Sequence, residues 1–401
     1  MTKKIGSPNA VVVGALFTLG LLMASYAGGQ GLLTRLPSPA PGNSSLSRVV
    51  ANEAGEIYLS WVSREAQQVT LEFARLTNDG WDATRVISRG SNWFVNWADF
   101  PVLSVDSSGM VAHWLQLSAA GNYDYDIRAR FYRQDKATWS EARTIHGDGV
   151  SAEHGFVSML PLNDGTTLIS WLDGRETVLK EPPGAMTLRA GIFDKSGATI
   201  SEWQLDDRVC DCCQTSSAMT QNGPIVVYRA RGQQEVRDIY ATRLVDGSWT
   251  LPQVIHNDNW QIAGCPVNGP SVTAMNKQVA VAWFSAKDDV PKIQLVLSTD
   301  SGLSFSEPVV VESPNTNGRV DTTILDSGDI VVSWMETAGE AKILLSRYNP
   351  SGELLGTTEV ASSSASRRSG FPIIESVGDT VYVTWTDIGA TPQVRVARID
   401  Y

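Results

Sequence analysis

The chain lacks most of the signatures by which common catalytic and nucleic-acid sites are recognised. It has only four histidines and four cysteines in 401 residues, and its 32 basic residues are outnumbered by 43 acidic ones, for a formal net charge of -11. Such a balance argues against a nucleic-acid partner or an anionic membrane surface. No Ser-His-Asp arrangement, phosphate-binding loop or dinucleotide fingerprint is present.

Long hydrophobic runs are also lacking, with one exception at the N-terminus. Lys3 and Lys4 precede an uncharged stretch over residues 10–27 that ends in the small-x-small sequence Ser25-Tyr26-Ala27. This pattern predicts that residues 1–27 are an export signal. An uncleaved anchor is the alternative, because about 18 residues is the lower limit of a membrane span. In either case we expect an extracytoplasmic protein, periplasmic or secreted, that meets a membrane only through this segment.

What the sequence does contain is a repeat. A short β-rich run ends in an aromatic residue, the marker aromatic, seven times at intervals of 51 to 57 residues. The intervening runs, bounded by Gly, Pro, Asn and Asp, indicate four strands per unit, called A to D in chain order. Such repeats predict an all-β fold, a β-propeller of seven four-stranded blades, with six blades and one aberrant repeat as the alternative. The markers are Trp61, Trp114, Trp171, Tyr228, Trp283, Trp334 and Trp385.

The ends of the chain bear on how such a ring closes. Residues 48–401 make up the propeller, whereas residues 28–47, rich in Pro, Ser and Gly, are expected to be a linker. The seventh unit stops at Tyr401 after its third strand, so it lacks strand D. We predict that the segment near residues 32–36 supplies that strand, and a disordered tail after the signal is the alternative.

In a propeller, the D-to-A loops between blades and the B-to-C loops within blades lie on one face, here called the loop face. Nearly all residues capable of chemistry fall in these loops, whereas the C-to-D turns hold mostly turn formers. The loop face is therefore predicted to carry any ligand site. Its candidate ligand-binding residues are Asp99, His154, Asp173, Arg175, Arg229, Asp238, Arg319, Arg367 and Arg368.

One C-to-D turn fits the Asp-box of sialidase-like propellers, with Ser298, Asp300, Gly302 and Phe305 at the motif positions. The chain from about residue 44 onward also resembles exported bacterial proteins labelled exo-alpha-sialidase or BNR-repeat proteins. That resemblance rests on HGFVS at 154–158, WLDGR at 171–175, MTLR at 186–189, CDCCQT at 210–215, CPVNGP at 265–270, GRVD at 318–321 and RSGFP at 368–372. The Asp-box specifies a fold, not an activity.

The resemblance implies, for an enzyme, a glycoside hydrolase of the exo-alpha-sialidase type. Sialidases hold a carboxylate with three arginines and use a Tyr activated by a Glu, with an Asp as acid. Here Arg175, Arg319 and Arg367 or Arg368 are the clamp candidates, and Asp99 or Asp173 is the acid candidate if its pKa is raised. The chain departs from sialidases in lacking their Arg-Ile-Pro motif and in its seven markers, and no Tyr-Glu pair is evident. Each Arg and Asp also has a purely structural interpretation, as in a pairing of Arg319 with Asp321.

The cysteines are the sharpest local signal. Cys210, Cys212 and Cys213 lie in the loop that enters the fourth blade, and Cys265 lies in the loop that enters the fifth. In an exported protein four cysteines predict two disulfides. Because Cys-x-Cys-Cys is too compact for easy pairing within itself, a thiolate site for copper or zinc is the alternative, with His154 as a further ligand.

Two functions therefore stay open. In one, the loop face binds a glycan or another small acidic ligand, with Trp93, Trp97 and Trp260 as stacking platforms. In the other, the protein is a non-catalytic periplasmic propeller whose cysteine loops form disulfides or hold a metal, and whose face binds a protein or a small ligand.

Overall fold

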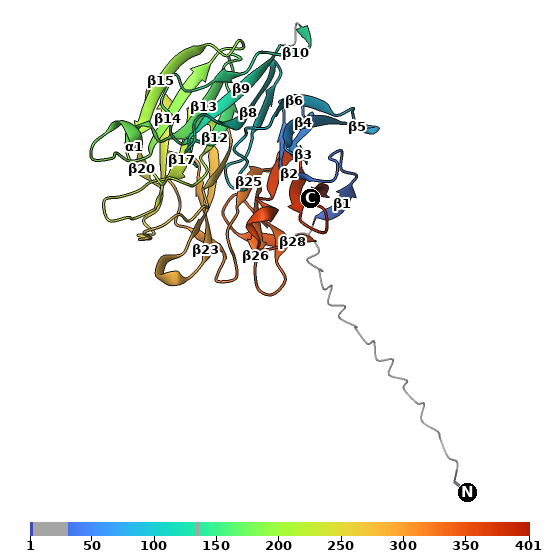
Figure 1. The fold of residues 1–401 in the computed structure, drawn as a ribbon. Helices are drawn as coiled ribbons and strands as arrows, with labels where there is room; N and C mark the ends of the chain where they lie inside the picture. The colour runs from blue at the N-terminus through green and yellow to red at the C-terminus, as the bar shows by residue number, and fades with distance from the viewer. Residues whose placement is uncertain (3–30, 134–135) are drawn as a thin grey trace.

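The computed structural model describes residues 1–2, 31–133 and 136–401. Within these residues the chain forms seven antiparallel sheets (Figure 1). This arrangement is the all-β propeller of seven blades that the marker aromatics predict. The helical segments described are α1 (Arg175–Leu179) and the short 3-10 turns η2 (Lys287–Asp289) and η3 (Arg367–Ser369).

In six of the blades, strands A to D follow one another in chain order across the sheet. Strand D of blades one, two and four is divided into two short strands. Blades one to three comprise β2 (Ser44–Ala51), β3 (Ile57–Glu65), β4 (Gln68–Thr77), β5 (Gly80–Trp81) and β6 (Arg85–Gly90); β7 (Leu103–Asp106), β8 (Gly109–Leu117), β9 (Tyr125–Arg133), β10 (Thr138–Trp139) and β11 (Arg143–Thr144); and β12 (His154–Pro161), β13 (Thr167–Asp173), β14 (Thr187–Phe193) and β15 (Thr199–Asp206).

The remaining blades follow the same plan until the last, whose fourth strand comes from the other end of the chain. They comprise β16 (Ser216–Thr220), β17 (Gly223–Arg229), β18 (Ile239–Val245), β19 (Ser248–Trp249) and β20 (Gln253–Val254); β21 (Ser271–Met275), β22 (Gln278–Ser285), β23 (Lys292–Ser298) and β24 (Val309–Glu312); β25 (Asp321–Ile324), β26 (Ile330–Glu336), β27 (Lys342–Tyr348) and β28 (Leu354–Ser362); and β29 (Ile373–Val377), β30 (Thr380–Asp387), β31 (Gln393–Asp400) and β1 (Leu32–Leu36).

The marker aromatics explain why the blades stack. All seven lie on strand B, and none is more than 4% exposed. Each belongs to a different one of seven hydrophobic clusters, and each cluster joins two neighbouring blades. The cluster around Trp114, for example, unites Val62 and Leu71 of blade one with Leu103 and Ala112 of blade two. A twisted sheet that is apolar on both faces is buried only by such neighbours, so the repeat in the sequence is a repeat of inter-blade packing.

The ring is closed by hydrogen bonds between the two ends of the chain. Innermost strands contact one another in the order β2, β7, β12, β16, β21, β25, β29 and back to β2. In the last blade, β1 pairs antiparallel with β31, from Leu32 opposite Asp400 to Leu36 opposite Val396, and the C-terminus lies beside it (Figure 1). The N-terminal segment therefore supplies the strand D that the seventh blade lacks.

The described part of the predicted linker, residues 31–47, is held against the propeller. After β1, the indole nitrogen of Trp81 donates to the Pro37 carbonyl (2.8 Å), and Gln393 donates to that of Ala40 (3.0 Å). Residues 3–30, which include most of the predicted export signal, lie outside the described residues. In the part of the chain that is described, no helix has both the length and the apolar character needed to cross a membrane.

The Asp-box turn closes on itself between β23 and β24. Ser298 donates its hydroxyl to Asp300 (2.7 Å) and accepts from the Gly302 amide (3.0 Å), while the Asp300 carboxylate accepts from two further amides, those of residues 303 and 304. Gly302 has φ of +76°, and a Cβ there would lie 2.7 Å from Ile225. Phe305 packs against the cluster between blades four and five. The motif thus stabilises the fold, on the face opposite the candidate site.

The loop face is assembled by contacts between the two kinds of loop. Isolated bridges join residues of a D-to-A loop to residues at the B-to-C end of an adjacent blade, so these loops form one surface, as expected. The bridged pairs are Trp93 with Gln116, Tyr125 with Glu153, Val209 with Ala230, Val236 with Gln261, and Thr316 with Glu336.

Candidate functional site

Arg319, one of the clamp candidates, is enclosed by the fold. It is 4% exposed and donates to the Ser369 hydroxyl (2.6 Å) and the Gly370 carbonyl (2.9 Å), as well as to the carbonyls of residues 365 and 366. Burial, together with the nearby charge of Arg367, lowers the pKa of Arg319 to about 10. The described contacts do not pair it with Asp321, which accepts instead from Ser271 and Ile374. Its donors hold the loop before β29 to the loop before β25.

Arg229 and Asp238 likewise hold loop backbone in place, here between blades four and five. Arg229, 1% exposed, donates to the backbone carbonyls of residues 237, 268 and 284 at 2.6 to 3.2 Å. Asp238 accepts from the amides of Asn259 and Trp260, and burial raises its pKa. Trp260 is itself buried against Phe284. These candidates therefore organise loops and present little to a ligand.

His154, Asp173 and Arg175 lie together in a buried charge network that also includes Asp148 and His146. Arg175 donates to both oxygens of Asp173 (2.8 and 2.7 Å), and its Nε lies 2.8 Å from an Asp148 oxygen. Nε2 of His154 is 3.0 Å from Asp148, and its ring stacks on that of His146 at 3.6 Å. The WLDGR and HGFVS sequences thus meet side by side, as β13 and β12 of one blade.

The contacts within this network shift the pKa values of His154 and Asp173. Nδ1 of His154 faces the carbonyl oxygens of Ala152 and Tyr125, while its Nε2 faces Asp148, so both ring nitrogens meet acceptors. Burial alone would lower the pKa of His154, but Asp148 and Asp173 raise it. For Asp173, burial alone would raise the pKa, but the hydrogen bonds from Arg175 outweigh this effect, so the pKa is lowered. The lowered pKa of Asp173 favours its carboxylate form, which leaves it unsuited to act as an acid.

Asp99, the other acid candidate, belongs to a group of three that the sequence analysis did not find. The Tyr125 hydroxyl lies 2.9 Å from Asp99 and 3.0 Å from Glu153, and Asp99 also accepts from the Phe156 amide (2.7 Å). Burial raises the pKa of both carboxyl groups to about 7. A phenol has one proton, so one carboxyl must donate if both contacts are hydrogen bonds. This is a Tyr-Glu pair, but Tyr125 is fully buried, which denies it contact with a substrate.

Asp99 also lines a cavity of about 70 Å³ on the propeller axis. Its walls come from all seven blades and include Arg48, Ser158, Ser271 and Asp321. A space of this size can hold only a few water molecules, so it is too small for a saccharide.

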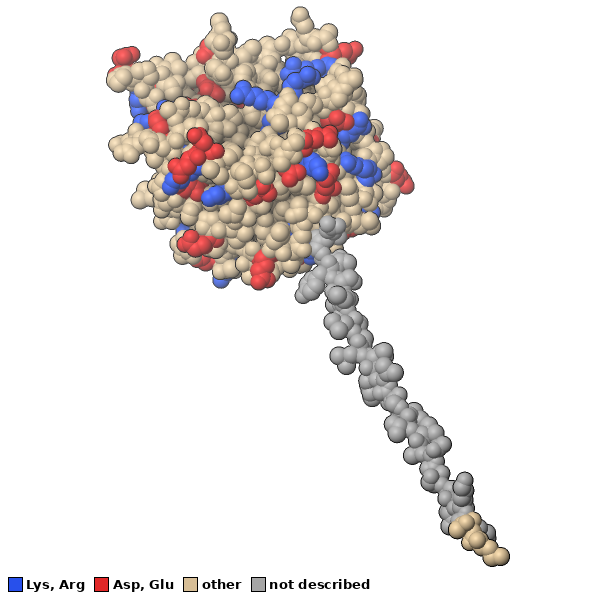
Figure 2. Space-filling view, turned by 90° about the horizontal axis from the view of Figure 1, so that it is seen from below, with Lys and Arg blue, Asp and Glu red and all other residues tan. Residues whose placement is uncertain are grey.

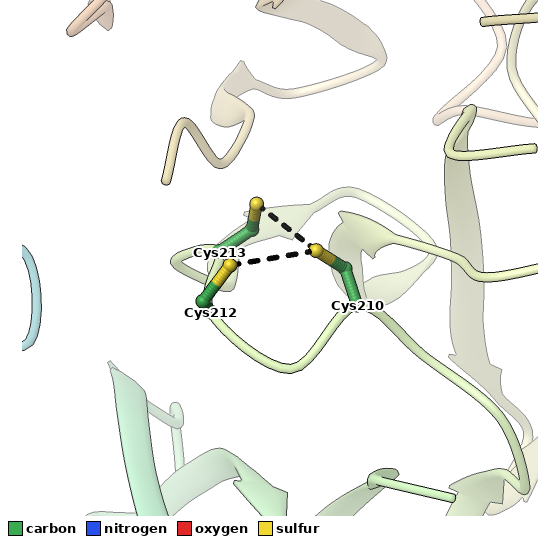
Figure 3. A group of neighbouring side chains, drawn as sticks. All are labelled: Cys210, Cys212 and Cys213. Carbon is green, nitrogen blue, oxygen red and sulfur yellow. Dashed lines mark hydrogen bonds between the residues drawn. The ribbon is translucent and has the colours of Figure 1, made fainter. Parts of the chain in front are cut away.

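The four cysteines meet where the loops that enter blades four and five adjoin. Sγ of Cys210 is 3.3 Å from that of Cys213 and 3.9 Å from that of Cys212 (Figure 3). Cys265 is near enough to Cys212 to raise the pKa of its thiol. Cys210 and Cys213 are buried, Cys212 is partly buried and Cys265 is exposed; no disulfide joins them in the structure. His154, considered as a further ligand, is instead hydrogen-bonded in the network with Asp148.

Arg367 and Arg368 are different, because they line an open groove of about 610 Å³. Arg64 and Trp97 line it with them, and no carboxyl group is among its lining residues. The three arginines are exposed, and the only side-chain contact described for any of them is that of Arg367 with the Trp97 ring, at 5.8 Å. The face in Figure 2 shows how acidic and basic side chains otherwise intermingle on this acidic protein. We call this feature the arginine groove.

The three tryptophans considered as stacking platforms also differ in their exposure. Trp93 is buried and stacks on Trp114 at 5.3 Å, and Trp260 is buried as described above. Trp97 alone of the three keeps part of its ring accessible, with Phe371 stacked at 5.8 Å. Arg367 and Arg368, two of the candidate residues, thus line the groove together with Arg64, which was not among the candidates.

Comparisons with known proteins extend these findings only to the fold. No family model and no curated protein matches the chain. Among solved structures, the polysaccharide lyase Uly1 is similar with a TM-score of 0.54 at 8% identity, over 93% of this chain and 99% of that one. An α-L-arabinanase of Penicillium chrysogenum complexed with arabinobiose reaches 0.48 at 12% identity (92% and 98% covered), and the NanB sialidase of Streptococcus pneumoniae 0.49 at 8% (93% and 95%). At 8% identity the likeness to Uly1 is one of fold alone, and it agrees with the seven-bladed β-propeller formed by the sheets of this chain.

Proposed function

We propose that the protein is an exported propeller that binds an acidic glycan in the arginine groove. The observation that carries the proposal is the set of three guanidinium groups, those of Arg64, Arg367 and Arg368, which surround one hollow and form no ion pair or hydrogen bond with any residue that the structure describes. Guanidinium donors match the geometry of carboxylates. The part of the Trp97 ring that stays accessible beside Phe371 and Arg319 offers apolar surface for contact with a sugar.

The electrostatic setting supports the same conclusion. The chain carries a net charge of -11, so most of its surface repels an anionic polymer, whereas the groove has three cations and no lining carboxylate. The field is thereby concentrated at one place. The export signal predicted over residues 1–27 would put this groove outside the cytoplasm, where acidic polysaccharides occur.

A binding function without hydrolysis agrees best with the positions of the acid and nucleophile candidates. The acid and nucleophile candidates, Asp99 and Tyr125, are buried, and neither is among the residues that line the groove. No pair of carboxyl groups faces the groove for acid and base chemistry. We therefore propose a glycan-binding function and expect no turnover of a fluorogenic sialoside.

The test is calorimetric titration of the full chain with an oligogalacturonate and with a neutral oligosaccharide of equal length. We expect binding of the acidic ligand only, and about a tenfold weaker affinity, or 1.4 kcal/mol, for Arg64→Ala and for Arg367→Ala. Affinity should also fall severalfold as salt rises from about 0.05 to 0.5 M.

Arg89→Ala is the matched control, since Arg89 is an exposed arginine of blade one outside the groove. Equal binding of the neutral sugar, or an equal loss in the Arg89 variant, would contradict the proposal. Measurable hydrolysis of the sialoside would replace binding by catalysis as the function.

A further inference from the structure

The cysteine cluster has a geometry that the arginine groove does not explain. Three sulfur atoms from one loop lie within 4.8 Å of one another, and the fourth, that of Cys265, lies in the adjoining loop, near enough to Cys212 for each thiol to influence the pKa of the other. All the cysteines of the chain are thus gathered in one place. We propose that Cys210, Cys212, Cys213 and Cys265 bind one thiophilic d10 cation, Zn(II) or Cu(I).

The sulfur separations fit a shared metal ion. Thiolates bind Zn(II) at about 2.3 Å in a tetrahedron, which puts neighbouring sulfur atoms about 3.8 Å apart. The two separations around Cys210 are 3.3 and 3.9 Å. Figure 3 shows the side chains of Cys212 and Cys213 both directed toward the sulfur of Cys210. Only small movements would therefore bring the three atoms onto one ion.

The backbone around the cluster is already fixed. The Cys210 amide donates to the Arg229 carbonyl (2.9 Å), and the Gln214 side chain donates to the Ala98 carbonyl and accepts from the Gly269 amide (2.8 Å). Gly269 is so close to this segment that a Cβ would lie 2.1 Å from the Gln214 carbonyl oxygen. The loop that holds Cys265 is thereby fastened to the loop that holds the other three, as a preformed site requires.

The charges near the cluster favour thiolates. Arg237 is 2% exposed, and its Nη1 donates to the Cys210 sulfur at 3.1 Å; Arg229 is close enough to act on the same sulfur. Four thiolates with Zn(II) carry a net charge of -2, which Arg229 and Arg237 offset in part, since Arg237 also pairs with Glu235 (2.8 Å). Hydrogen bonds to the bound atoms are the usual outer shell of metal sites. A disulfide sulfur is a poor acceptor, so the Arg237 contact is better explained by a thiolate.

The competing state is a pair of disulfides, Cys210 with Cys213 and Cys212 with Cys265, which an oxidising compartment would favour. The deciding experiment uses the full chain purified anaerobically. Bound metal is measured by plasma mass spectrometry, and thiols are counted after denaturation without reductant. The reduced, metal-free protein is then titrated with Co(II) as a spectroscopic substitute for Zn(II), and with Cu(I) against a competing chelator.

We expect one metal ion per chain, four thiols on denaturation, and protection of those thiols from alkylation in the native protein. A thiolate-to-Co(II) charge-transfer band would identify a zinc-type site, and preference for Cu(I) would identify copper. Cys210→Ser and Cys265→Ser should each weaken binding by at least about a hundredfold, beyond the usual outer-shell effect. Asp211→Asn, which changes the same loop but leaves every sulfur in place, should retain the metal.

Two results would overturn the proposal. One is a chain without free thiols as isolated that also takes up neither ion after reduction. The other is a metal that the cysteine variants still bind, for then it would lie elsewhere, as at the cluster of Asp148, His154 and Asp173. Thermal unfolding of each variant distinguishes a lost site from a lost fold, and alkylation of the wild-type chain needs no variant at all.

Discussion

Two groups of arginines on the loop face differ in what surrounds them. Arg229 and Arg319 are enclosed, and their donors end on backbone carbonyls, whereas Arg64, Arg367 and Arg368 stand open around the groove. One loop serves both groups: residues 365–370 offer carbonyls to Arg319 and extend two side chains into the groove.

A guanidinium group is available to a ligand only where the backbone around it leaves its donors unused. A buried carbonyl without a donor costs free energy, and irregular loops between blades leave many carbonyls without strand partners. A long side chain with five donors satisfies several of them at once. An arginine in such a loop is therefore structural when it meets these carbonyls, and it becomes a ligand site only where the loop ends at the surface.

The largest effect that this comparison predicts is on stability. Arg319→Ala would remove the donor to the carbonyls of residues 365 and 370 and to the Ser369 hydroxyl, while the Ser366 carbonyl would still accept from Ser369. We expect the free energy of unfolding to fall by about 3 kcal/mol or more. Arg368→Ala, an exposed change in the same loop, should stay within about 0.5 kcal/mol. Urea denaturation of both variants measures this, and a near-equal loss would abolish the distinction between the two groups.

The fold was predictable because its determinants are local and periodic. Each marker aromatic lies within a strand B, which continues one to four residues beyond it, and fills its own inter-blade cluster, so the spacing from Trp61 to Trp385 records the blades directly. The role of residues 32–36 followed from the missing fourth strand after β31. The gathering of the cysteines followed from the adjacency of two blades.

The chemistry of the loop face was less predictable, because its contacts join distant residues. Asp321, two positions away, was the expected partner of Arg319, but the actual partners, Ser369 and Gly370, are 50 and 51 residues away. Tyr125 and Glu153 are 28 residues apart, and no motif marks either one. Loop sequences record which donors are present, and only the folded backbone determines which acceptors they meet.

The free energy of unfolding should also depend on pH, through two buried carboxyl groups of the loop face. Burial raises the pKa of Asp99 and of Glu153 to about 7, above the values near 4 of the unfolded chain. Their contribution to stability is therefore fully present below about pH 4 and is lost as pH rises through 7. We expect the free energy of unfolding to decrease on the order of 2 to 4 kcal/mol from this source as pH rises toward 8.

Asp99→Asn isolates the share of this effect that belongs to Asp99. The amide retains an acceptor for the Phe156 amide but does not titrate, so its stability should vary less between pH 5 and 8 than that of the wild-type chain. Asp246→Asn, at an exposed turn where φ is +50°, should leave the wild-type slope unchanged. A parallel pH profile for Asp99→Asn would show that this carboxyl does not titrate in that range.

Arg237 is a third kind of arginine, because it is enclosed like Arg319 but donates to a sulfur atom, that of Cys210. The smallest predicted effect is that of its substitution. Arg237→Gln removes the cation beside Cys210 while leaving four thiols, so metal affinity should fall about 10- to 100-fold with the stoichiometry kept at one. Arg231→Gln is the matched control, because Arg231 pairs with Asp211 and Glu235 and should change affinity only slightly. Competition titrations with a chelator measure both. An unchanged affinity in Arg237→Gln would make its contact with Cys210 a matter of packing and would weaken the argument that the sulfur there is a thiolate.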